Sequence, residues 1–211
     1  MNNNKKFIIA INREAASGGK AVAEKLGEML GVNVYTKAAL KGLIEHFNLS
    51  EEEIERLRSR KQSWWDEVCQ FNRQFAAAAT EYEVNHEVTP KQVYHMEAQL
   101  LKEIAARESC IIVGRAAFHI FKDDPSAKKL FFIADRDVRI ANMKAKKGVD
   151  DQEAGRIIDE IDKQREKFTK SIVGVSRYDC RNYDLVWNIS HLDPDTVAGI
   201  LASRVKEETQ I

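Results

Sequence analysis

Residues 7–20 read FIIAINREAASGGK, an apolar run that leads into a turn of small residues. The run at residues 7–11 is apolar throughout, which is typical of a strand buried on both faces of a parallel sheet. After the turn, apolar residues recur at helical spacing up to Leu30. A strand, a small-residue turn and a helix, in this order, are the context in which a phosphate-binding loop works.

The turn contains the residue types that bind phosphate. Gly18 and Gly19 let the backbone approach an anion, and the start of the helix adds N–H groups and a partial positive charge. Lys20 places a full positive charge at the helix start, where the helix dipole disfavours it, and this indicates a bound anion. We therefore expect nucleotide phosphates to be bound by residues of this turn: Arg13, Ser17, Gly18, Gly19, Lys20 and Ala21.

Two positions depart from the P-loop pattern, which is glycine, any four residues, and then Gly-Lys followed by Ser or Thr. Glu14 stands where the first glycine is expected, and Ala21 stands where a magnesium-binding hydroxyl is expected. The residues alone leave two interpretations open. Either the turn binds phosphate, or it is a glycine-containing strand-to-helix turn with an exposed lysine.

The same stretch resembles a known signature. Residues 12–19 are similar to Ser-Arg-Glu-Phe-Gly-Ser-Gly-Gly of the bacterial cytidylate kinase-like family, a branch of the P-loop nucleoside monophosphate kinases. The resemblance implies a three-layer α/β P-loop NTPase fold, with a five-stranded parallel sheet, helices on both faces and a helical lobe for acceptor and lid. It also implies ATP and Mg²⁺ as cofactors. The matching residues are Arg13, Glu14, Ser17, Gly18 and Gly19, and the differing ones are Asn12, Ala15 and Ala16.

Length and composition fit one globular domain over residues 1–211. Of the 211 residues, 44% are hydrophobic and 31% charged, enough to bury one α/β core. Lys plus Arg and Asp plus Glu both total 33, so the formal net charge is zero and nothing indicates a nucleic-acid partner. No apolar stretch is long enough for a membrane span or a signal peptide, so we expect a cytoplasmic protein. The three cysteines are widely spaced, which argues against a disulfide framework or a zinc site.

A helical insertion is expected at about residues 48–86, between the second and third strands. Ser50 and Glu53 form a capping box at its start, and aromatic residues such as Trp64 and Phe71 follow. By resemblance, this insertion is the lobe that binds the acceptor nucleotide. Its aromatic side chains are better explained by packing or by a homodimer interface than by base stacking.

Arginines follow two of the expected strands. Residues 109–115 read as a buried strand that ends in Gly-Arg. Because ligands of open α/β sheets bind at the carboxyl ends of strands, Arg115 is expected beside a phosphate. Pairing of Arg115 with a nearby carboxylate is the structural alternative. Residues 130–134 form the next strand, and by resemblance Arg139, one turn into the following helix, lies near the nucleotide.

The helix expected at about residues 151–172 carries a charged residue on its apolar stripe. Arg165 lies on that stripe and needs an anionic partner, because burying an unpaired charge is costly. Asp162, three residues earlier, can supply that partner on the same helix. The family has Asp-x-x-Arg near the lid that closes over the phosphates, so residues 150–181 are expected to form a lid that includes Arg177.

Two further helix features are predicted. Thr36 is expected to cap a helix that follows a short strand at residues 32–35. A closing helix is expected to begin at Pro194, with its core face made by Val197, Ile200, Leu201 and Val205.

Together these features predict phosphoryl transfer from ATP to a small acceptor, and the resemblance makes a nucleoside monophosphate, CMP or dCMP first, the expected substrate. The magnesium ligands stay undetermined, because Glu14 can act through water or can pair with Arg13. The departures from the P-loop pattern keep an alternative open, namely a nucleotide-binding regulatory or interaction protein on a P-loop fold with a degenerate active site. The expected catalytic residues are Lys20, Arg115, Arg139, Asp162, Arg165 and Arg177.

Overall fold

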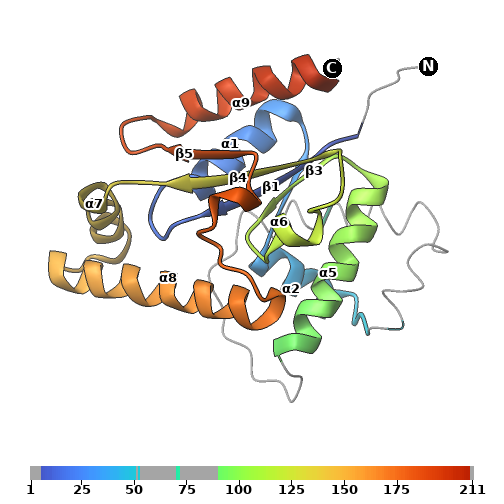
Figure 1. Cartoon of the computed structure of the whole chain (residues 1–211), viewed down its shortest axis with the longest axis horizontal. Helices are drawn as coiled ribbons and strands as arrows, with labels where there is room; N and C mark the ends of the chain where they lie inside the picture. Colours follow the sequence, from blue (N-terminus) through green and yellow to red (C-terminus); the bar gives the residue numbers. More distant parts are fainter. Residues whose placement is uncertain (1–5, 51, 53–69, 72–89, 210–211) are drawn as a thin grey trace.

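The computed structural model describes residues 6–50, 52, 70–71 and 90–209 (Figure 1). The strands in these residues are β1 (Ile8–Arg13), β2 (Asn33–Thr36), β3 (Cys110–Val113), β4 (Ala127–Ile133) and β5 (Leu185–Asn188). They form one sheet in the order β2-β3-β1-β4-β5, and every pair of neighbours is parallel. The predicted five-stranded parallel sheet is therefore confirmed.

Helices cover both faces of this sheet (Figure 1). One face carries α1 (Gly19–Leu30) and α9 (Pro194–Thr209), and the other carries α2 (Lys37–His46), α5 (Pro90–Arg107) and α6 (Ala117–Ile120). In β1 the side chains alternate between the two faces, as the two-residue period of a strand requires. Ile9 and Ile11 pack with α1 and α9, whereas Ile8 and Ala10 pack with α2, α5 and α6. The core thus has the predicted three layers.

Two helices after β4 pack on the turn that follows β1. They are α7 (Arg136–Lys147) and α8 (Asp151–Val173), which lie against each other (Figure 1). Met143 of α7 and Ile158 of α8 enclose Ala15 of the turn in a small apolar cluster. The loop after α8 contains a short 3₁₀ helix, η2 (Cys180–Asn182). The turn, α7, α8 and this loop therefore meet at the carboxyl ends of the central strands.

Both predicted helix features are confirmed except at one residue, since α9 begins at Pro194 as predicted and Val197, Leu201 and Val205 face the core. The Thr36 hydroxyl accepts the Ala39 N–H at 3.2 Å and caps α2, as predicted. Ile200 does not face the core, since 53% of it is exposed. Helix α9 turns Ala198 and Ala202 toward the sheet, where their small side chains allow the helix to approach the sheet closely. In this orientation Ile200 lies roughly 130° around the helix from the centre of the buried face.

The predicted helical insertion at residues 48–86 lies mostly outside the described residues, and so do Glu53 and Trp64. Phe71 is described, and its ring stacks on His46 with centroids 4.2 Å apart. This residue therefore packs against the end of α2. Within the described part of the chain, no helix is long and apolar enough to cross a membrane.

Candidate functional site

The turn between β1 and α1 has the backbone of a phosphate-binding loop. Gly18 caps α1 with φ 89°, in the left-handed region that favours glycine. Gly19 must lack a side chain, because a Cβ there would lie 2.9 Å from the Cβ of Arg13 and 3.0 Å from the ring of Phe132. The buried Ser17 hydroxyl donates to the Glu14 carbonyl at 3.1 Å and shapes the turn. The first N–H groups of α1 have no acceptor within the helix, so they are suited to an anion.

Lys20 lies in the first turn of α1 with half of its side chain exposed. Its ammonium is 3.2 Å from the carboxylate of Glu24, one turn further along. An exposed pair at this spacing contributes little to stability. Lys20 can therefore leave Glu24 for an anion at the helix start at small cost.

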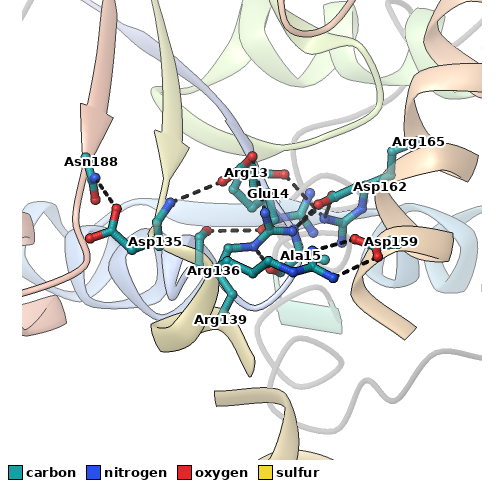
Figure 2. Close-up of polar contacts among 12 residues, drawn as sticks. Arg13, Glu14, Ala15, Asp135, Arg136, Arg139, Asp159, Asp162, Arg165 and Asn188 are labelled. Atoms are coloured by element: carbon teal, nitrogen blue, oxygen red, sulfur yellow. Dashed lines mark hydrogen bonds and ion pairs between the residues drawn. The ribbon is translucent and has the colours of Figure 1, made fainter. Parts of the chain in front are cut away.

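Side chains from α7 and α8 bind both the N–H and the carbonyl of Ala15, a residue of the turn (Figure 2). Asp162 of α8 accepts the Ala15 N–H at 2.9 Å, and Arg139 of α7 donates from Nε to the Ala15 carbonyl at 2.8 Å. Asp162 and Arg139 are also an ion pair with each other. Asn142 donates to the carbonyl of Ala16 at 2.9 Å. The path of the turn is thus fixed by residues far away in the sequence.

Ala16 is strained, because its φ of 59° lies in the left-handed region that costs an L-residue about 1–2 kcal/mol. The Ala16→Gly variant should remove this strain, although glycine gives the unfolded chain more conformational entropy. The net effect should be a rise of about 0.5–1 kcal/mol in the free energy of unfolding. Thermal unfolding would show this as a rise in Tm of a few degrees. Ala141→Gly, on the exposed face of α7, should instead lower Tm. A lower Tm for Ala16→Gly would show that the backbone of Ala16 is not strained.

Asp162 is the centre of a buried cluster of arginines. Besides Arg139, its carboxylate lies 3.3 Å from Arg177 and 3.6 Å from Arg165. The predicted pair of Asp162 and Arg165 is therefore present. Arg177 is only 1% exposed and also binds the carbonyl of Arg13, to which Arg165 donates at 3.3 Å. The structure thus brings together four of the predicted catalytic residues beside the predicted phosphate loop.

The carboxylates near the turn do not fit a magnesium site. Glu14 lies 3.3 Å from Arg139 and accepts the Ala134 N–H at 3.2 Å, while Asp162 is bound by arginines (Figure 2). Ala21 offers no hydroxyl. Within the described ranges, no group of three or more His, Cys, Asp or Glu residues is placed to hold a metal ion. The described side chains therefore do not by themselves fit Mg²⁺.

Arg115 lies apart from this cluster, at the carboxyl end of β3. It forms an ion pair with Glu97 of α5, so the structural alternative predicted for it is present. Its guanidinium lies 4.6 Å from the ring centroid of Phe168, a residue of α8. Arg115 and the Asp162 cluster are therefore linked through the same helix.

The sequence did not reveal a hydrogen-bonded set that ties the loop after α8 to β1. Asn12 donates to the Tyr183 hydroxyl at 2.6 Å, and that hydroxyl donates to the Arg177 carbonyl at 2.7 Å. The Arg177 guanidinium in turn donates to the Asn12 side chain at 3.1 Å. No motif could have indicated these contacts, because the three residues are polar or aromatic side chains without a periodic pattern.

Burial of the Tyr183 hydroxyl raises its pKa to about 12, although the hydrogen bond from Asn12 opposes the shift. The unfolded chain then loses this proton near pH 10, before the native protein does. The contribution of the protonated Tyr183 hydroxyl to stability is therefore fully present below pH 10. The free energy of unfolding falls by about 2–3 kcal/mol as pH rises to about 12. Tyr183→Phe keeps the ring stacked on Phe131 but cannot titrate, so its unfolding free energy should fall less over this range. Urea titrations at several pH values measure this free energy for both proteins. An equal fall between pH 10 and pH 12 in the two proteins would contradict this prediction.

Known proteins are similar to this chain in sequence and in fold. The sequence pattern of the cytidylate kinase-like family matches residues 8–191. A protein of Thermoplasma volcanium named cytidylate kinase is 24% identical over 200 residues, which cover 94% of this chain and 91% of the relative. Another cytidylate kinase, from Methanopyrus kandleri, is 26% identical over 199 residues, which cover 94% and 92%.

Solved structures agree with the fold. An uncharacterized protein from Eubacterium ventriosum has a TM-score of 0.67 at 24% identity, with coverage of 96% of this chain and 99% of that protein. Shikimate kinase from Bacteroides thetaiotaomicron has a TM-score of 0.50 at 14% identity, with coverage of 97% and 99%. At these identities the likeness shows the P-loop kinase fold alone. The sequence pattern goes further because it spans most of the chain: this protein belongs to the cytidylate kinase-like family.

Proposed function

We propose that this protein transfers the γ-phosphoryl group of ATP to a nucleoside monophosphate, with CMP and dCMP as the first candidates. The observation that carries the proposal is the cluster beside the turn after β1, where Arg139, Arg165 and Arg177 share the carboxylate of Asp162 and Glu14 also pairs with Arg139. These three guanidinium groups lie next to a loop with phosphate-binding backbone. Family membership and the two relatives named cytidylate kinase support the choice of acceptor.

On the donor side, we assign the phosphates of ATP to the turn. The backbone N–H groups of residues 17–21 lie in the turn and at the start of α1, where the helix dipole favours an anion. Lys20 adds a mobile positive charge at the same place. Arg13 is assigned to the donor site as well, because its backbone forms the entry to the turn.

The chemistry needs little beyond positioning and charge. An oxygen of the acceptor phosphate attacks the γ-phosphorus, the bond to the bridging oxygen breaks, and ADP leaves with that electron pair. Arg165, with 28% of its side chain exposed, is the arginine of the cluster best placed to meet the transferring group directly. Arg139 and Arg177 are buried, so they reach a phosphate only if they give up a contact with Asp162. In the present arrangement they fix the turn.

On the acceptor side, we assign the phosphate of the monophosphate to Arg115. It lies at the carboxyl end of β3, beside the central strand that carries the donor turn. Residues 150–181, which include α8 and the following loop with Arg177, are assigned as the lid. Its closure would exclude water from the transferring group.

A second candidate function is nucleotide binding without turnover, as in a regulatory protein. The observation that favours it is the lack of a hydroxyl at Ala21, together with carboxylates that are already bound by arginines. Such a protein would keep the phosphate-binding turn but would lack protein ligands for a metal ion.

A panel of acceptors separates these candidates. ADP production from Mg-ATP would be measured with each nucleoside monophosphate, the deoxy forms, free nucleosides and shikimate. We expect turnover with a monophosphate, highest with CMP or dCMP. Calorimetry with the non-hydrolysable analogue AMP-PNP would accompany the panel. Binding of AMP-PNP without turnover would support the regulatory function, and turnover with shikimate or a nucleoside would overturn the proposed acceptor class.

A further inference from the structure

Arg115, at the carboxyl end of β3, lies in a backbone segment with unusual dihedral angles. Gly114, Arg115 and Ala116 all have positive φ, of 84°, 55° and 50°. Only the first is a glycine, so the other two are in a region that side chains disfavour. Residues held in such conformations cluster at ligand sites, where the surrounding structure determines them. The structure around Arg115 must therefore supply the contacts that keep it in place.

Glu97 of α5 supplies the main contact. Only 3% of its side chain is exposed, and it forms an ion pair with one terminal nitrogen of Arg115. Burial raises the pKa of Glu97, while the charges of Arg115 and Lys37 oppose that shift. Phe168 packs on the guanidinium from the lid side. Glu97 and Phe168 thus hold the guanidinium between α5 and α8.

The held guanidinium keeps an unused donor. The Nε of Arg115 is buried, and among the residues that the structure describes it has no hydrogen-bond partner. A buried donor without an acceptor is costly unless a ligand supplies the acceptor. An anion that approached Arg115 would satisfy that donor, while Glu97 kept the terminal nitrogen fixed.

We propose that Glu97 is a positioning residue for the acceptor: it holds Arg115 so that the remaining donors of the guanidinium meet the acceptor's phosphate. This inference rests on the proposed function. In the competing arrangement, Glu97 pairs with Arg115 only while the site is empty, and the acceptor's phosphate displaces Glu97 when it binds. The unused buried Nε favours positioning, because the anion does not need to displace Glu97 to find a donor.

The test is Glu97→Gln, which keeps an acceptor oxygen but removes the charge. We expect the KM for CMP to rise about tenfold, with kcat and the KM for ATP unchanged. A purely structural role would lower Tm and the active fraction, and hence kcat, without this selective rise in one KM. The matched control is Glu103→Gln, which changes another buried carboxylate of α5 about 9 Å further along the helix and should leave both KM values unchanged.

Arg115→Gln separates failure of the inference from failure of the proposed function. If Arg115→Gln raises the KM for CMP and Glu97→Gln does not, the positioning role is overturned while the kinase stands. A lower KM for CMP in Glu97→Gln would overturn positioning in favour of competition. If the wild-type protein neither turns over nor binds CMP, the proposed function fails and the inference fails with it.

Discussion

Replacing Asp162 by asparagine should lower the free energy of unfolding by about 3–5 kcal/mol, because it removes the charge that Arg139, Arg165 and Arg177 share. Asparagine keeps an oxygen that can accept the Ala15 N–H, so the loss would come from removal of the negative charge that the three arginines share. For a chain of this length, Tm should fall by roughly 10 °C. Thermal unfolding followed by circular dichroism measures the effect.

Asp159→Asn is the matched control for this prediction. Asp159 lies one turn before Asp162 on α8 and forms a well-aligned pair with Arg136, at 2.7 and 2.8 Å. Both partners are exposed, and exposed pairs contribute little. Its Tm should therefore stay close to that of the wild-type protein. If Asp159→Asn and Asp162→Asn shifted Tm equally, the cluster around Asp162 would not be a main source of stability.

Replacing Lys20 by alanine should lower kcat/KM for the best acceptor by roughly 10²–10³-fold, because it removes the one full charge at the start of α1 that can follow the phosphates through the reaction. Since Lys20 is half exposed and its pair with Glu24 is weak, Tm should hardly change. Steady-state kinetics with a thermal-shift control measures both.

The control for Lys20 is Lys25→Ala on the same helix. Lys25 is exposed and pairs with Glu28 and Asp195, away from the turn. Its removal should leave kcat/KM unchanged. Equal activity of the Lys20→Ala and wild-type proteins would show that this lysine does not bind the donor's phosphates.

Much of the fold could be predicted because its signals are local. The all-apolar run at residues 7–11 indicates a strand buried on both faces, and the helical spacing after the turn indicates α1. Thr36 could be recognised as a cap from its position alone. Ile200 was predicted wrongly because two neighbouring stripes of α9 satisfy helical spacing, and only packing against the sheet decides between them.

The site could be predicted only in part. The sequence indicates Arg165 as a charge on an apolar stripe, and the same helix offers Asp162 as its partner. Glu97 carries the same signal, since it lies four residues before the buried Leu101 of α5. The convergence of Arg139 and Arg177 on the same aspartate depends on how distant helices pack, and so does the link between Asn12 and Tyr183. Sequence spacing does not encode such contacts.

The proposed kinase activity is tested by measuring ADP production from Mg-ATP by the wild-type protein, with CMP, with each other nucleoside monophosphate and without an acceptor. The phosphate-binding turn and the arginines around Asp162 predict turnover that depends on CMP and that yields equal amounts of ADP and CDP. No ADP above background with CMP or with any other nucleoside monophosphate would contradict the claim.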